Sequence, residues 1–191
     1  MSALASLLVV AQLVNPSFED DPAAPKGWTR EIGATTGNGA ATADIAIVEH
    51  YPTGPLAVRI TGTAATQRWP MLTQSFPVEP GQRVLFRVLA KARGLRREAN
   101  QFANANALMI FRTEQGSRIS LLTSPVLLGD TDWVPLHVTA IAPAGSARVV
   151  VGIFASMSGS VTFDSAELTI APTDRTDPEA RRAAFEALRL H

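Results

Sequence analysis

The sequence predicts an all-β domain in which two antiparallel sheets pack face to face. Between residues 45 and 170, short apolar runs are separated by turn-forming residues at the spacing typical of β-sandwiches. Inside several runs, apolar and polar residues alternate with a period of two, and no helical period is sustained. Because each half-apolar strand must bury one face against another layer, two stacked sheets are the simplest arrangement.

The predicted strands follow the apolar runs in chain order, at residues 44–49, 56–61, 71–78, 83–93, 107–114, 117–128, 133–141, 147–155 and 160–170. The fourth run shows the alternation clearly, because Val84, Phe86 and Val88 fall on one face while Arg87 and Lys91 fall on the other. Clusters rich in Gly, Pro, Asp and Ser at residues 79–82, 114–117, 129–132 and 142–146 supply the turns.

The two ends of the chain differ from this pattern. Residues 178–190 predict a short helix, with Asp177 as its N-cap, Pro178 as its first residue and Glu179 as an early acid that suits the helix dipole. This helix could dock on the sandwich, begin a linker or bind a protein partner; we expect docking. The sequence thus divides into an apolar N-terminal segment (1–12), a β-sandwich domain (13–172) and a linker with a helix (173–191).

The N-terminal segment bears on export. Residues 3–11 are apolar and end in Val-Val-Ala, which has the small-residue form of a signal-peptidase site, but no basic residue precedes them. They are either the end of a signal peptide that begins upstream or a first strand. We favour the signal, and therefore expect a secreted or extracytoplasmic protein.

Composition excludes several classes of function. The 17 basic and 17 acidic residues give no net charge, which argues against a nucleic-acid partner, and no apolar run is long enough to span a membrane. Positive charge concentrates only in residues 91–97, which we expect to form a solvated loop. The chain has no cysteine, so disulfides, thiol nucleophiles and cysteine-ligated metals are excluded.

Several motifs in order resemble a known family. Residues 13–19 (LVNPSFE), the Gly-Trp at 27–28, residues 67–74 (QRWPMLTQ), the Pro-Gly turn at 80–81, Asp132-Trp133 and residues 161–168 (VTFDSAEL) resemble carbohydrate-binding modules of the family 4 and 9 type. The resemblance covers residues 13–170. It implies a galactose-binding-like jelly roll, an all-β antiparallel two-sheet sandwich, here with a short C-terminal helix.

The resemblance also implies a structural calcium ion where the first segment meets the last strand. Glu19 and Asp164 would supply carboxylate oxygens, and carbonyls near Ser17 would complete the shell. Calcium takes six to eight oxygen ligands, so this chemistry is suitable. The alternative is that both carboxylates pair with arginines or contact water.

For a glycan, the resemblance implies a concave sheet face with an aromatic ring and polar side chains. Trp69 stands at the family's binding-aromatic position, next to Gln67 and Arg68. The further candidate ligand-binding residues are Gln74, Arg87, Arg112 and Tyr51. Packing at the edge of the sandwich is the alternative for Trp69. The Asn-rich insert at residues 94–107 is a second possible binding loop.

The expected function is a non-catalytic module that binds an oligosaccharide or polysaccharide. The histidines are scattered, and none of the common hydrolase or phosphate-binding motifs is present, so no enzymatic activity is expected. The alternative is a protein-interaction or structural β-sandwich that has lost sugar binding. It draws on the shortage of aromatic residues (6%) and on the C-terminal helix.

Overall fold

The computed structural model describes residues 12–20, 25–34, 44–49, 54–62, 68–97, 105–172 and 176–188. The elements within these ranges are β1 (Thr29–Ala34), β2 (Asp44–Glu49), β3 (Leu56–Gly62), β4 (Arg68–Pro77), β5 (Arg83–Arg96), β6 (Ala105–Arg112), β7 (Arg118–Thr123), β8 (Gly129–Ile141), β9 (Arg148–Ala155), β10 (Ser158–Ala171) and α1 (Pro178–Leu188).

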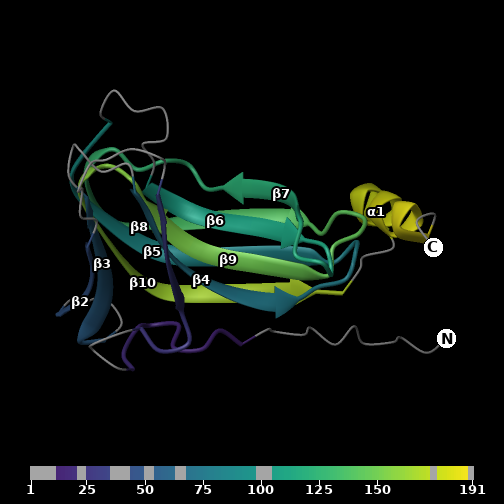
Figure 1. Ribbon diagram of the computed structural model, residues 1–191, viewed down its shortest axis with the longest axis horizontal. Helices are drawn as coiled ribbons and strands as arrows, with labels where there is room; N and C mark the ends of the chain where they lie inside the picture. The colour runs from purple at the N-terminus through teal and green to yellow at the C-terminus, as the bar shows by residue number, and fades with distance from the viewer. Residues whose placement is uncertain are drawn as a thin grey trace.

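The strands form two five-stranded sheets that pack on each other, which confirms the predicted all-β sandwich (Figure 1). One sheet has the order β1-β4-β9-β6-β7 and the other the order β2-β3-β10-β5-β8. Neighbouring strands pair antiparallel in both sheets. Helix α1 lies at one end of the sandwich (Figure 1).

The period-two pattern of the sequence builds the core. In β5 the side chains of Val84, Phe86, Val88 and Ala90 are buried, and Arg87 between them is exposed. The inward residues of β9 and β10, including Val149, Ile153 and Phe163, meet them from both sheets. Turns occur at the predicted clusters 79–82, 114–117 and 142–146, whereas the predicted turn at 129–132 is the beginning of β8. Gly81 has a φ of 85°, which residues with a Cβ rarely adopt.

Two strand predictions and one loop prediction need correction. Strand β1 was not predicted, because Thr29–Ala34 contains one large apolar residue, Ile32, and lies at a sheet edge. The expected strand 117–128 ends at Thr123, and the following residues run along β6 through backbone hydrogen bonds from Ser124 and Leu127. The expected loop at 94–107 is shorter than predicted, because β5 extends to Arg96 and β6 begins at Ala105.

The C-terminal helix forms with the predicted cap. The Asp177 carboxylate accepts a hydrogen bond from the Glu179 N–H (2.9 Å), and the Asp177 carbonyl accepts one from the Arg181 N–H (2.9 Å). Asp177 also forms an ion pair with Arg83 of β5, and Ala183 is buried. The helix therefore lies against the sandwich. No helix in the described part of the chain combines the length and apolar character that a bilayer crossing needs.

Candidate functional site

The sheet β1-β4-β9-β6-β7 turns one face toward the core and the other outward; we call the outward side the open face. Residues that pair across antiparallel strands share a face, so the strand register gives the rows of side chains on it. Leu72, Ile153 and Met109 point into the core. Their neighbours along each strand therefore belong to the open face.

One row crosses four strands of the open face and combines apolar and polar side chains. In register it contains Glu31 of β1, Met71 of β4, Phe154 of β9 and Asn106 of β6; we call it the amide row. The Thr73 hydroxyl in the next row donates a hydrogen bond to Glu31 Oε1 (3.2 Å). An apolar floor with polar groups at both ends is the usual composition of a small-molecule site.

Asn106 is the unusual member of the amide row. Its side chain is 1% exposed, and neither its amide nitrogen nor its amide oxygen has a hydrogen-bond partner among the described residues. The hydroxyl of Ser156, two residues beyond Phe154, is also buried without a hydrogen-bond partner among the described residues. Buried polar groups are nearly always paired, so these atoms are exceptions that need an explanation.

The middle of the open face is buried, because Thr73 is 3% exposed and Leu108 is 5% exposed. Gly152 stands between Thr73 and Leu108, and a Cβ on it would approach the Leu72 carbonyl oxygen to 2.4 Å. In the following row, Val150 of β9, Ile110 of β6 and Leu121 of β7 are in register. Leu121 is 49% exposed, so this aliphatic row reaches the edge of the sheet with solvent access.

The far end of the open face carries three arginines from adjacent strands. Arg148 of β9 pairs with Arg112 of β6, and Arg112 pairs with Arg118 of β7; we call this the arginine row. Arg148 Nε donates to the Ser75 hydroxyl (3.0 Å), and Arg112 Nη1 donates to the Gly116 carbonyl (2.8 Å). The structure therefore gathers guanidinium groups that lie far apart in sequence.

The register places Trp69 at the open-face sheet. Trp69 and Arg68 belong to β4 and pair with Gly33 and Ala34 of β1, at the end opposite the arginine row. Gln67 and Tyr51 lie outside the described residues.

The other expected ligand-binding residues are dispersed. Gln74 is 7% exposed and engages the backbone of Val14, accepting from its N–H (3.0 Å) and donating to its carbonyl (2.7 Å). Arg87 belongs to the other sheet, where it lies 3.6 Å from Glu167. Only Arg112 joins the open face. Asn106 belongs to the Asn-rich insert that the sequence offered as a second possible binding loop. Arg118 and Arg148 were missed as ligand candidates, because the strand register is what brings them beside Arg112.

The first segment and the last strand meet, as the resemblance implies. The strand β10 contains a bulge between Asp164 and Glu167 relative to β5, with Ser165 at a φ of 53°. The N–H of Ala166 in this bulge donates to the carbonyl of Pro16 (2.8 Å). A pocket of about 320 Å³ lies alongside, lined by residues of the first segment and of β10.

The two carboxylates of the predicted calcium site belong to the first segment (Glu19) and to the strand β10 just before its bulge (Asp164). Asp164 is fully buried and accepts a hydrogen bond from the Ser165 N–H (2.6 Å). The Glu19 carboxylate accepts from the Leu56 N–H (3.1 Å) and packs on Gly54. No group of three or more His, Cys, Asp or Glu side chains suited to a metal occurs in the described ranges. A cation here would therefore need backbone carbonyls as ligands.

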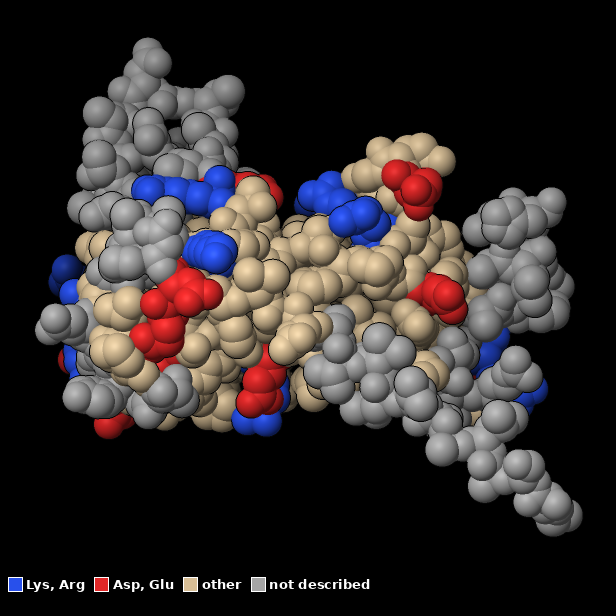
Figure 2. Space-filling view, turned by 90° about the horizontal axis from the view of Figure 1, so that it is seen from below, with Lys and Arg blue, Asp and Glu red and all other residues tan. Residues whose placement is uncertain are grey.

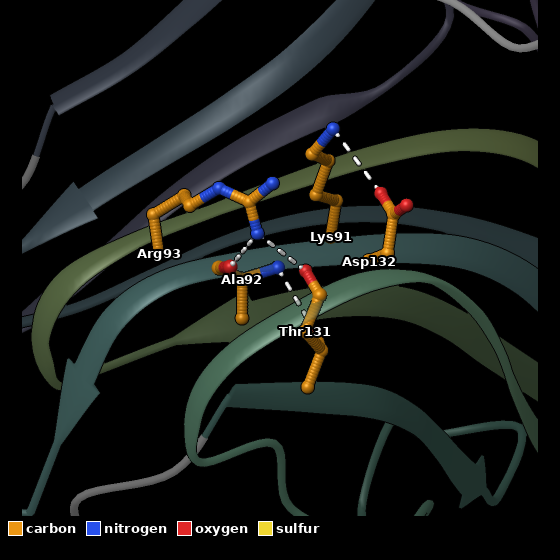
Figure 3. Close-up of polar contacts among 5 residues, drawn as sticks. All are labelled: Lys91, Ala92, Arg93, Thr131 and Asp132. Carbon is orange, nitrogen blue, oxygen red and sulfur yellow. Dashed lines mark hydrogen bonds and ion pairs between the residues drawn. The ribbon is translucent and has the colours of Figure 1, made fainter.

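The basic stretch at 91–97 is part of a strand rather than the expected loop. Figure 3 shows Lys91 and Asp132 as an ion pair (3.2 Å), and Arg93 Nη1 donates to the carbonyls of Ala92 (2.9 Å) and Thr131 (2.8 Å). The hydrogen bond from Lys91 is the main cause that lowers the pKa of Asp132, helped by the N–H of Trp133. Lys91 and Arg93 are thus engaged at the end of the β5–β8 ladder.

Figure 2 shows small groups of acidic and basic side chains on a mainly uncharged surface, without dominance of one sign. This distribution matches the zero net charge of the chain.

Comparisons by sequence give no relative: no protein-family model and no curated protein matches the chain. Solved structures do match. The CBM22-1 xylan-binding domain of Paenibacillus barcinonensis Xyn10C superposes with a TM-score of 0.55 at 17% identity, covering 91% of this chain and 100% of that one. A family 4 carbohydrate-binding module gives 0.54 at 18% identity, with coverage of 83% and 99%.

Larger proteins also contain this fold. The enzymatically active domain of tailspike protein 4 from bacteriophage CBA120 matches with a TM-score of 0.59 at 14% identity, over 76% of this chain. The chain spans only 19% of that tailspike fragment and 28% of a matching GH51 α-L-arabinofuranosidase. Further matching structures include carbohydrate-binding modules of families 16, 22 and 61. The chain therefore has the two-sheet jelly-roll fold that these modules have.

Proposed function

We propose that the protein is a non-catalytic module that binds a glycan on its open face. The observation that carries this proposal is the buried Asn106 amide, which lies in register with Phe154 and Met71. Neither its nitrogen nor its oxygen has a hydrogen-bond partner among the described residues. A sugar offers hydroxyl donors and acceptors to the amide, and its C–H surface suits an apolar floor. The fold shared with carbohydrate-binding modules supports the same assignment.

In this proposal Trp69 extends the glycan site at the end of the sheet that lies opposite the arginine row. It lies two residues before Met71 in β4, and strand alternation assigns position 69 to the same face as Met71 and Thr73. In the proposal its ring stacks on a sugar next to the amide row. Because Asn106 is enclosed, a hydroxyl that reaches it must displace the groups packed over the amide.

The non-catalytic part of the proposal rests on the carboxylates of the open face. Hydrolysis of a glycosidic bond commonly uses two carboxylates that face each other across the sugar. Among the described open-face rows, Glu31 is the single carboxylate, and it accepts a hydrogen bond from Thr73. This arrangement suits ligand binding better than acid–base chemistry.

A glycan array followed by calorimetry tests the proposal. We expect wild type to bind at least one glycan, and expect Trp69→Ala and Asn106→Ala each to weaken binding by about tenfold or more. Asn106→Ala removes a buried amide that has no hydrogen-bond partner among the described residues, so the thermal unfolding midpoint of this variant should stay unchanged or rise. Trp133→Ala, which alters a partly buried tryptophan of the other sheet, is the matched control. No binding across a broad array rejects the assignment.

We further propose a structural calcium ion at the junction of the first segment and β10. The donor set is oxygen: the buried Asp164 carboxylate, the Glu19 carboxylate and carbonyls near Ser17. Bound there, the ion would neutralise the carboxylates and join the two chain segments. The test is thermal unfolding in calcium, magnesium and chelator. We expect a calcium-specific rise that Asp164→Asn abolishes and that Glu167→Gln, an exposed neighbour, retains.

The alternative function is a protein-interaction or structural module. The observation that favours it is the aliphatic row of Val150, Ile110 and Leu121, with Leu121 half exposed at a sheet edge. Deleting residues 173–191 and measuring oligomeric state tests the part assigned to α1. If glycans bind and truncation changes nothing, the alternative is rejected. Because polymeric glycans are largely extracellular, glycan binding also implies a secreted or extracytoplasmic protein.

A further inference from the structure

The arginine row is unusual because it places like charges directly opposite one another. Arg148 of β9 pairs with Arg112 of β6, and Arg112 pairs with Arg118 of β7 directly after a bulge in the β6–β7 ladder. Adjacent strands lie about 4.8 Å apart, so three guanidinium-bearing positions fall within about 10 Å. Like charges in this position oppose sheet formation. None of the three forms an ion pair with an acidic side chain in the described part of the chain.

The protein also orients two of these guanidinium groups. Arg148 is bonded to Ser75 of the neighbouring strand, and Arg112 is bonded to the carbonyl of Gly116 in the turn before β7. Each of these bonds uses one of the five N–H donors that a guanidinium carries. The remaining donors suit oxyanions, because arginine binds a carboxylate, or two oxygens of a tetrahedral group such as sulfate, through two parallel hydrogen bonds.

The arginine row continues the proposed glycan site. Along β9, Arg148 lies six residues before Phe154, which at about 3.4 Å per residue is about 20 Å from the amide row. The aliphatic row and Gly152 lie between them on the same face. A glycan chain that covers the amide row can therefore place a substituent over the arginines.

We propose that the arginine row binds the anionic group of an acidic glycan, so the ligand class is a carboxylated or sulfated polysaccharide. This inference rests on the proposed glycan binding at the open face. It adds a charged subsite that selects among glycans, and it assigns Arg112, Arg118 and Arg148 as the residues that recognise the oxyanion.

The experiment compares polysaccharides that differ only in charge. Binding is measured by calorimetry for glucuronoxylan against its carboxyl-reduced form, and for dextran sulfate against dextran. We expect a preference of about tenfold or more for the charged member of at least one pair, which weakens as salt rises. The first pair reports on carboxylate and the second on sulfate.

The double variant Arg112→Gln/Arg148→Gln should abolish the preference for the charged glycan. Its thermal unfolding midpoint should stay unchanged, because the substitutions relieve repulsion between neighbouring arginines. Arg96→Gln/Arg97→Gln removes the same charge from exposed positions at the end of β5 in the other sheet, and should keep the preference. Equal binding within both pairs, or an equal loss in the control, overturns the inference while glycan binding stands. Binding to a duplex oligonucleotide but to no glycan overturns both proposals.

Discussion

The backbone N–H of Ala166 donates a hydrogen bond to the carbonyl of Pro16 at 2.8 Å, which joins the last strand to the first described segment. The β10 bulge makes this bond possible, because an extra residue turns one N–H away from the β5 ladder. Phe18, two residues after Pro16, is fully buried and packs on Trp28 with ring centroids 5.1 Å apart. The first segment is therefore an integral part of the core.

Phe18→Ala should lower the free energy of unfolding by about 3–5 kcal/mol, the usual cost of truncating a buried phenylalanine. Urea denaturation measures this loss. Leu128→Ala, at a side chain that is 51% exposed, serves as the control and should change stability by less than about 0.5 kcal/mol. Similar small losses for both variants would contradict the packing described for Phe18.

Gln74 should behave as a structural residue. Its side chain makes two hydrogen bonds with the backbone of Val14, so Gln74→Ala should cost about 1–3 kcal/mol of stability and leave glycan affinity unchanged. Gln74→Glu keeps the acceptor for the Val14 N–H but loses the donor to the Val14 carbonyl. We expect it to destabilise the fold as well. A loss of glycan affinity at unchanged stability would contradict this structural role and indicate that Gln74 contacts the ligand.

Gly54→Ala should disturb the junction at Glu19. A Cβ at position 54 would lie 2.0 Å from Glu19 Oε1, so the carboxylate must move away from the Leu56 N–H. We expect a loss of about 1–3 kcal/mol and of any calcium-dependent stabilisation. Gly116→Ala is an informative comparison, because open space surrounds Gly116 and only its φ of 83° opposes a side chain. Retention of the calcium effect in Gly54→Ala would contradict a ligand role for Glu19.

The ion pair between Lys91 and Asp132 predicts a measurable titration. The hydrogen bond from Lys91 lowers the pKa of Asp132 below its ordinary value in the folded protein. A carboxyl group with a lowered folded-state pKa contributes stability above its unfolded pKa, and this contribution is lost as pH falls through the folded value. NMR titration of Asp132 should show the low midpoint, and Lys91→Met should raise it. Since the Asp132 side chain is 82% exposed, we expect no large effect on folding.

Much of the fold follows from sequence because strand alternation is local. The run at 44–49 appears as strand β2 with the expected bounds, and the buried face of β5 is the one that alternation predicts. The edge strand β1 lacks this signal, since the segment TREIGA carries little apolar surface. Pro125 stands just beyond the end of β7, where the expected strand had continued.

The site was harder to predict, because it depends on which strands become neighbours. Arg87 and Arg112 look alike in sequence, yet the sheet order puts Arg87 beside Glu167 on one sheet and Arg112 between two arginines on the other. Gln74 could have been assigned from sequence, since it shares the strand face of Leu72, which alternation turns inward. Arg118 and Arg148 required the register itself.

The segment after β7 has a consequence for self-association. Ser124 and Leu127 donate backbone hydrogen bonds to the carbonyls of Ala107 and Ala105, so residues beyond β7 continue to occupy the exposed side of β6. An uncovered strand edge is a template on which another polypeptide can add, and natural proteins commonly block it with a loop. This margin of the sheet is thus protected against β-aggregation, although β7 itself is short.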